Sequence, residues 1–221
     1  MNLKNRLLKI ILGISFAVAL AAGVSYYIFM PRGPIVEFNY NRDAKQMLQY
    51  FYDDWWWLFP GKDFSPEYIL EHKAPGKEWY QQKYKGKLNI KVVRKDGHVA
   101  AFTTYYKKNH YEGVVQFIYV APAFRRQGLA VKLTKYAVDQ LFKMGLPKVT
   151  LTTRINNPAR KIYEGLGFIE TGRDGHGLMF YKINEKTFRE GLKKKFEPKV
   201  IEGLEKEAEV PENLYYKPPG S

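Results

Sequence analysis

The sequence predicts a domain of the α/β class, in which short strands form a sheet and amphipathic helices cover it. Residues 114–120 are mostly β-branched or aromatic, which is typical of a central strand. From Leu129 to Phe142 the apolar residues recur at helical spacing, which indicates a helix with one face on a sheet. Asp96-Gly97 separates two alternating segments and indicates a β-hairpin. The chain has 221 residues, 45% of them hydrophobic, enough for one domain with appendages.

The segment before the hairpin is expected to contain a strand and two helices. Residues 35–40 are expected to form the strand, and Asp43 to cap the first helix. Residues 55–57 are consecutive Trp residues, which cannot all lie on one helix face. At least one is therefore expected at a surface, a cleft or a membrane interface, unless the segment forms an aromatic core. Pro66 predicts the first position of another helix.

The second half of the chain alternates between strands and breaks. A polar loop is expected over residues 107–113, before the central strand. Gly145 and Pro147 are expected to end the long helix. Strands are predicted over 88–94, 99–106, 149–153, 169–171 and 178–183.

Composition narrows the chemistry. The chain has no Cys, which excludes disulfides, thiolate catalysis and Cys-based zinc sites, and its 4 His lack metal-ligand spacing, so no metal site is expected. The formal net charge of +14 favours a polyanionic ligand or anionic lipid, although a solubilising surface would give the same charge. Nucleic-acid binding is not favoured, because no recognised motif for it is present.

The N-terminal segment, residues 10–31, contains no charged side chain. As a helix, about 22 residues span roughly 33 Å, close to the about 30 Å of a bilayer core. This predicts one transmembrane helix within an anchor of residues 1–31. A cleaved signal peptide is the alternative, because the start is basic and small-residue triplets lie between Ala17 and Ala21. The apolar run continues to Met30, which favours the uncleaved anchor.

The turn after the central strand has the features of a phosphate-binding loop. It reads Arg125-Arg126-Gln127-Gly128-Leu129-Ala130 and leads directly into the long helix. Free N–H groups and the positive dipole end attract phosphate at a helix N-terminus. Gly128 permits a close approach to the backbone, and the two Arg side chains add positive charge. A plain strand-to-helix turn remains the alternative from this segment alone.

A second motif follows the strand at 149–153. It has Asn156, Ala159, Tyr163 and then Gly167-Phe168, in the pattern N-x-x-A-x-x-x-Y-x-x-x-G-F. Taken in this order, the two motifs resemble those of the GNAT superfamily of N-acetyltransferases. The resemblance covers about residues 35–183 and leaves out the apolar N-terminal segment and the charged tail.

The resemblance implies the GNAT fold, of class α/β (α+β), here preceded by one transmembrane helix. It implies a mixed, mostly antiparallel sheet of about six to seven strands flanked by about four helices. The expected organisation is an anchor at 1–31, an acyltransferase domain at 32–183 and a charged, partly flexible tail at 184–221.

The resemblance also implies the reaction, which is direct transfer of an acetyl group from acetyl-CoA to a primary amine on a small molecule or a peptide. Both substrates would bind together, and Tyr163 would protonate the leaving thiolate. The N–H of Ile118 or Val120 would donate to the thioester oxygen. The residues expected to bind acetyl-CoA are Ile118, Tyr119, Val120, Arg125, Arg126, Gln127, Gly128, Leu129, Ala130, Asn156 and Ala159.

The general base is not evident. Many relatives carry a Glu on the central strand, where this chain has Gln116, which cannot act as a base. Glu112 and His110, just upstream, could act through water, with Glu112 as the named candidate. Asp53 or Asp54 could serve instead from the acceptor side. A second hypothesis is therefore a catalytically weak, membrane-tethered GNAT module that binds acyl-CoA or a protein partner. A third is a basic surface protein that binds lipid or nucleic acid.

The expected location is a single-pass membrane protein with its catalytic domain in the cytosol. Lys4, Arg6 and Lys9 would by themselves favour a cytoplasmic N-terminus and an exported domain. The use of cytosolic CoA that the resemblance implies favours the opposite orientation. The oligomeric state is not indicated by any feature of the sequence.

Overall fold

The computed structural model describes residues 33–58, 65–71, 73–75 and 88–193. Within these ranges no helix is both long and apolar enough to cross a bilayer. The predicted span at 10–31 lies outside them, as does the tail beyond Lys193.

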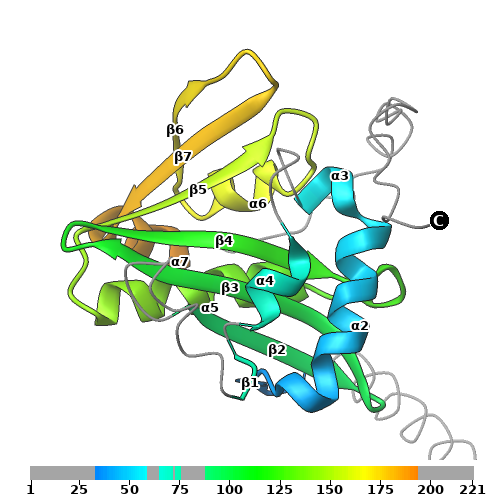
Figure 1. The fold of residues 1–221 in the computed structure, drawn as a ribbon. Helices are drawn as coiled ribbons and strands as arrows, with labels where there is room; N and C mark the ends of the chain where they lie inside the picture. Colours follow the sequence, from blue (N-terminus) through cyan, green and yellow to red (C-terminus); the bar gives the residue numbers. More distant parts are fainter. Residues whose placement is uncertain (1–32, 59–64, 72, 76–87, 194–221) are drawn as a thin grey trace, which may run out of the picture. The chain divides into compact units, whose positions relative to one another are not determined.

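The core is one mixed sheet of seven strands in the order β1-β2-β3-β4-β5-β7-β6 (Figure 1). Strands β4 and β5 pair in parallel and the other neighbours are antiparallel, so the sheet is mixed and mostly antiparallel, as predicted. The strands are β1 Ile35–Glu37, β2 Asn89–Lys95, β3 His98–Asn109, β4 Glu112–Val120, β5 Lys148–Arg154, β6 Ile169–Arg173 and β7 Leu178–Asn184.

Helices cover both faces of this sheet (Figure 1). One face packs against α2 and α4 through a cluster that includes Phe51, Phe102 and Phe117. The other packs against α5, α6 and α7 through a cluster that includes Leu141 and Phe188. The helices are α2 Tyr40–Asp53, α3 Trp55–Leu58, α4 Pro66–Glu71, α5 Leu129–Lys143, α6 Arg160–Gly165 and α7 Glu185–Lys193, with a 3-10 turn, η2, at Pro122–Phe124.

The start of α2 differs from the prediction. Asn39, not Asp43, is the N-cap, and its side chain accepts a hydrogen bond from the Arg42 N–H at 3.1 Å. Asp43 lies inside the first turn, where its carboxylate accepts from the Asn39 N–H at 2.7 Å and from Arg94 Nε of β2 at 3.0 Å. The helix starts earlier than predicted because Asn39 caps it, and Asp43 is thereby placed to pair with Arg94.

The β2–β3 and β3–β4 hairpins gave one correct and one wrong prediction. Asp96 and Gly97 both have positive φ, 51° and 79°, as a type I′ turn requires. The polar loop predicted over 107–113 is wrong. Lys107 pairs with Gly113 and Asn109 with Glu112, so the polar residues continue the ladder at its solvent end.

Helix α7 docks closely on the turn that follows α6. Phe188 is fully buried, with its ring 5.7 Å from that of Phe142. At Gly191 a Cβ atom would lie 2.3 Å from the backbone oxygen of Leu166. The first part of the charged tail is therefore packed against the domain through a position where only hydrogen fits.

Candidate active site

The site is built around a divergence between β4 and β5. These strands pair at only three positions, Glu112 with Lys148, Gly113 with Val149 and Val114 with Thr150. In the β3–β4 ladder the register shifts, so that Thr104 pairs with Phe117 and Tyr105 with Val115. Gln116 is the extra residue of this bulge. Bulges bend a strand and redirect its side chains, and this one lies where the two strands separate.

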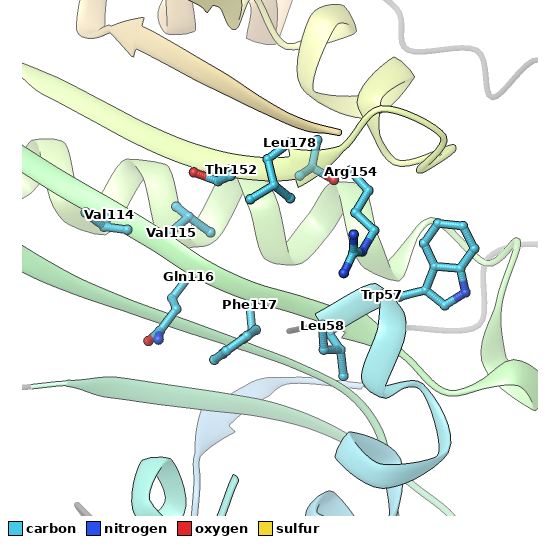
Figure 2. Close-up of a pocket in the computed structure, with 10 residues that line it drawn as sticks. Trp57, Leu58, Val114, Val115, Gln116, Phe117, Thr152, Arg154 and Leu178 are labelled. Carbon is cyan, nitrogen blue, oxygen red and sulfur yellow. The ribbon is translucent and has the colours of Figure 1, made fainter. Parts of the chain in front are cut away.

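A cavity of about 160 Å³ fills part of this opening (Figure 2). Strands β4 and β5 form two of its walls, and α3 adds Trp57 and Leu58 to its lining. The prediction that at least one Trp lies at a cleft is therefore confirmed, while Trp55 is buried. The described lining residues are Trp57, Leu58, Val114, Val115, Gln116, Phe117, Thr152, Thr153, Arg154 and Leu178.

The turn predicted to bind phosphate has the required backbone shape. Arg126 and Gly128 both have positive φ, 61° and 71°, and Gly128 is the N-cap of α5. Left-handed residues within such a turn direct successive N–H groups to one side and create an anion-binding concavity. Arg125, Arg126 and Gln127 are exposed, whereas Leu129 is buried in the core and can offer only its backbone.

A further cation lies at this turn that sequence reasoning missed. Lys95, at the end of β2, donates a hydrogen bond from Nζ to the Gln127 side-chain oxygen. Lys95 and Gln127 are far apart in the sequence, so no local pattern could have paired them. The contact adds positive charge beside the loop at the N-terminus of α5.

Arg125 links the loop to the opposite wall of the site. Its Nε donates to the Val120 carbonyl at 3.1 Å, and its guanidinium lies 3.3 Å from the Asp54 carboxylate. The Tyr119 hydroxyl donates to the same carboxylate at 2.6 Å. Burial raises the pKa of Tyr119, and the hydrogen bond to Asp54 raises it further. Arg125 and Tyr119 therefore use their side chains to hold Asp54.

Asp54 in turn supports α3. Its backbone carbonyl accepts from the N–H groups of Trp57, at 3.0 Å, and Leu58, at 3.2 Å. Asp54 thus joins the end of β4 to the helix that lines the cavity. The sequence singled it out only as a possible base, and it is not among the described residues that line the cavity.

The other residues expected to bind acetyl-CoA lie on β4 and just after β5, beyond the positions where these strands pair. Ile118 and Val120 are half-buried on the α5 face of β4, beyond the last pair with β5. Asn156 is exposed just after β5, and Ala159 precedes α6. The Ala159 N–H donates to the Asn157 side chain at 2.9 Å, so Asn157 helps to start this helix.

The structure places the predicted acid, Tyr163, in the core of the domain. It is 7% exposed, and its ring lies 6.0 Å from that of Phe168 and 6.2 Å from that of Tyr181. Burial raises the pKa of Tyr163, with a smaller contribution from Tyr181. Tyr163 is not among the described lining residues of the cavity.

The predicted base, Glu112, lies at the closed end of the divergence. It accepts from the Thr150 hydroxyl at 2.8 Å and pairs with Lys148 at 3.2 Å and Lys108 at 3.3 Å. Burial alone would raise the pKa of Glu112, but these three partners outweigh it and lower the pKa. A lowered pKa makes a carboxylate a weaker base. The contacts give Glu112 a structural role, which is to tie the hairpin to β5.

Arg154 is a site residue that sequence reasoning missed. It ends β5, is 9% exposed, and points its guanidinium into the cavity (Figure 2). Neither sequence motif includes Arg154. Only the alternation of side chains along a strand could have indicated that Arg154 and Thr152 lie on one face. Among the described lining residues there is no Asp, Glu or His. The described ranges also contain no group of three or more His, Cys, Asp or Glu that could hold a metal.

Known proteins share both the sequence pattern and the fold. The model of the acetyltransferase (GNAT) family matches residues 48–168. The ribosomal protein bS18-alanine N-acetyltransferase of Escherichia coli K12 is 30% identical over 114 residues, which cover 49% of this chain and 76% of that protein.

Two solved structures show the same fold at low sequence identity. The ribosomal-protein-alanine N-acetyltransferase of Brucella melitensis has a TM-score of 0.53 at 15% identity, over 68% of this chain and 99% of that one. YncA of Salmonella typhimurium, solved with acetyl-CoA, has a TM-score of 0.53 at 16% identity, over 76% and 98%. Since the family model spans the loop, the divergent strands and the Tyr163 motif, the chain belongs to the acetyltransferase (GNAT) family of acyl-transferring enzymes.

Proposed function

We propose that this protein is an N-acetyltransferase that transfers an acetyl group from acetyl-CoA to a primary amine by direct attack in a ternary complex. The observation that carries the proposal is the divergence of β4 and β5 beside the anion-binding turn of α5. The resemblance of the fold to YncA, whose structure contains acetyl-CoA, supports this choice of donor.

The chain would bind acetyl-CoA mainly through backbone N–H groups and less through side chains. The N–H groups from Arg126 to Ala130 would hold the pyrophosphate, with Arg126 and Lys95 adding positive charge. Beyond Val114 the edge of β4 that faces β5 is free of strand pairing within the described ladder, so its N–H groups can receive an extended ligand. Asn156 and Ala159 lie at the corresponding end of β5.

The acceptor must arrive as a neutral amine. An alkyl ammonium has a pKa near 10, so it must lose a proton before its nitrogen can form the amide bond as the C–S bond breaks. The cationic Arg154 disfavours a second cation in the cavity and so favours the neutral amine. Gln116, on the bulge, can hydrogen-bond a substrate but cannot take its proton. Tyr163 is proposed to supply the proton to the leaving thiolate, while the proton that the amine nitrogen loses as the amide forms passes to water.

The test uses the purified full-length chain, acetyl-CoA and a panel of amines that includes peptides with N-terminal Ala. Because the protein has no Cys, a thiol reagent detects only released CoA. Turnover with at least one amine is expected. Tight CoA binding without turnover on any amine would replace the proposal with the non-catalytic module.

Two Gly substitutions test the loop assignment. Gly128→Glu places a carboxylate and a Cβ at a position with φ of 71° and is expected to abolish CoA binding. Gly175→Glu is the matched control, because it adds the same charge where a Cβ meets no atom within 4 Å. Normal CoA affinity in the Gly128 variant would show that the turn does not hold the pyrophosphate.

The membrane anchor at residues 10–31 is part of the proposal, with the domain facing the cytosol. The uncharged run supports the anchor, and the need for CoA supports the orientation. A Ser221→Cys variant gives the chain its only thiol. Membrane-bound protein that reacts with an impermeant maleimide only after cell lysis is the expected result. Labelling of intact cells would reverse the orientation, and a shortened soluble product would indicate a signal peptide.

A further inference from the structure

We infer that the acceptor is a small amino acid, whose carboxylate binds Arg154 while its amine reaches the thioester. This inference rests on the proposed function and names the substrate class of that same site. It requires three properties of Arg154: that it is built into the cavity wall, that it can bind an anion there, and that the space suits a compact acceptor.

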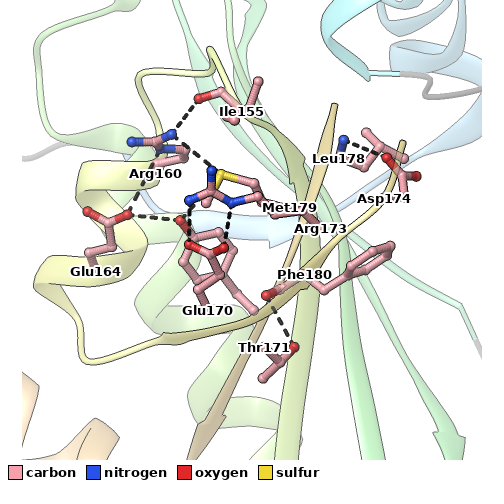
Figure 3. A network of polar contacts seen from close by, with 11 residues as sticks. Ile155, Arg160, Glu164, Glu170, Thr171, Arg173, Asp174, Leu178, Met179 and Phe180 are labelled. Carbon is pink, nitrogen blue, oxygen red and sulfur yellow. Dashed lines mark hydrogen bonds and ion pairs between the residues drawn. The ribbon is translucent and has the colours of Figure 1, made fainter. Parts of the chain in front are cut away.

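Arg154 is firmly held at the cavity wall. It pairs with Leu178 in the β5–β7 ladder, and the next residue, Ile155, donates its N–H to Gly177 at 2.9 Å. The Ile155 carbonyl accepts from the Arg160 guanidinium at 2.6 Å, which fixes the end of β5 against α6 (Figure 3). The backbone on both sides of Arg154 is therefore tied to neighbouring elements.

The guanidinium can bind an anion in addition to its contacts within the protein, because it has five N–H donors. Burial lowers the pKa of Arg154, while Asp174 raises it, and a guanidinium stays charged at any pH used for assays. The Asp174 carboxylate accepts from the Leu178 N–H at 2.9 Å (Figure 3). It also accepts from the His176 N–H at 2.9 Å, so its hydrogen bonds lie within its own turn. A second anion on the cavity side would pair with the guanidinium of a residue that is 9% exposed.

The remaining lining limits what that anion can be. The described lining combines this one cation with apolar and aromatic side chains, two Thr and Gln116. A carboxylate a few bonds from the amine would bring its negative charge to Arg154 and place the amine at the reacting end. The cavity, of about 160 Å³, lies in the β4–β5 opening that would also receive the thioester arm of acetyl-CoA, so the space beside Arg154 favours a compact acceptor.

The experiment compares amino acids with their matched amides on the full-length chain. L-Alanine and glycine are assayed beside L-alaninamide and glycinamide, within a panel of the common amino acids and of N-terminal-Ala peptides with neutral or acidic second residues. The best amino acid is expected to exceed its amide at least about 30-fold in kcat/KM, the effect of removing one partner of a buried charge pair.

Variants of two arginines assign this preference to its residue. Arg154→Gln is expected to remove the preference for acid over amide while leaving CoA affinity unchanged, and Arg154→Lys to retain part of it. Arg173→Gln is the matched control, because Arg173 lies on β6 and pairs with Glu170 at 2.6 Å outside the cavity. If Arg154→Gln does not fold, Arg154→Lys still tests the assignment, because an unchanged acid-to-amide ratio in that variant would overturn it.

Calorimetric titration of the same acids and amides in the presence of CoA separates this inference from the proposed function. Acid-selective binding that depends on Arg154, without turnover, would support the inference and overturn the proposed reaction. Turnover with equal rates for acids and amides would support the reaction and overturn the inference. A preference for acidic peptides over free amino acids, or no acid-selective binding at all, would also overturn it.

Discussion

Gly191→Ala tests whether the docking of α7 depends on a hydrogen atom at one position. An ideal Cβ there would lie 2.3 Å from the Leu166 carbonyl oxygen and 2.8 Å from its carbonyl carbon. Both atoms belong to the backbone at the end of α6, so no side-chain rotation can relieve the contact. Helix α7 would have to move away by about 1 Å, since ordinary contact begins near 3.4 Å.

The expected magnitude is the difference between two opposing terms. Within a helix Ala is favoured over Gly by about 1 kcal/mol. Overpacking a tight contact costs about 1–3 kcal/mol, and the upper end applies because moving α7 also loosens the fully buried Phe188. The net destabilisation is therefore about 2 kcal/mol, which corresponds to a fall in Tm of about 4–8 °C for a chain of this size.

Thermal unfolding of the variant and of Gly175→Ala provides the measurement. At Gly175 a Cβ meets no atom within 4 Å, so that change is expected to alter Tm little or to raise it. A rise in Tm for Gly191→Ala would mean that helix propensity dominates. The close approach of α7 to Leu166 would then not constrain the fold.

Three further substitutions test the pairing of Asp43 with Arg94, the contacts of Asp54 that connect β4 to α3, and the proposed acid. Burial alone would raise the pKa of Asp43, but its hydrogen bonds with Arg94 and the Asn39 N–H lower the pKa below the about 3.9 of the unfolded chain. The ionised carboxylate therefore contributes fully to the free energy of unfolding above that pH, and this contribution is lost as the pH falls through the lower pKa of the folded state. Asp43→Asn is therefore expected to cost about 3 kcal/mol at pH 7 and less in acid, measured by urea unfolding at both pH values; equal losses would refute the linkage. Asp54→Asn is expected to raise KM for both substrates at least about 5-fold, while the exposed Asp53→Asn leaves both unchanged in steady-state kinetics. Tyr163→Phe is expected to lower kcat at least about 100-fold with unchanged CoA affinity, and an unchanged kcat would leave this Tyr as a core aromatic.

Local patterns predicted the parts of the fold that depend on local physics. The Asp96-Gly97 turn was predicted from its residue types, and both residues adopt the positive φ that such a turn requires. The α5 loop was predicted from its Arg and Gly residues, and Gly128 is the N-cap of the helix. The cap at Asn39 was missed because Asp43 is an equally good capping residue in isolation. In the structure the Asp43 carboxylate instead accepts a hydrogen bond from Arg94, 51 positions away in the sequence.

The site was predicted only where a motif carried it. The turn and Asn156 follow from the two motifs, whereas Arg154 and the Asp54 link depend on strands and helices meeting in three dimensions. Glu112 illustrates the converse error. Its place before the central strand suggested a base, but Lys148 and Thr150, brought alongside by β5, occupy its carboxylate.

The short pairing of β4 with β5 has a consequence for handling the protein. Both strands lie wholly within the described ranges, and beyond Val114 each presents an edge in the interior of a sheet. Exposed edges invite pairing with other chains and hence aggregation. A ligand that bridges the two edges would block such pairing and stabilise the native state by about 2.7 kcal/mol at a concentration of 100 Kd. The donor substrate is therefore expected to connect β4 and β5 for as long as it is bound. Supplying CoA during purification should raise both the solubility and the Tm of the protein.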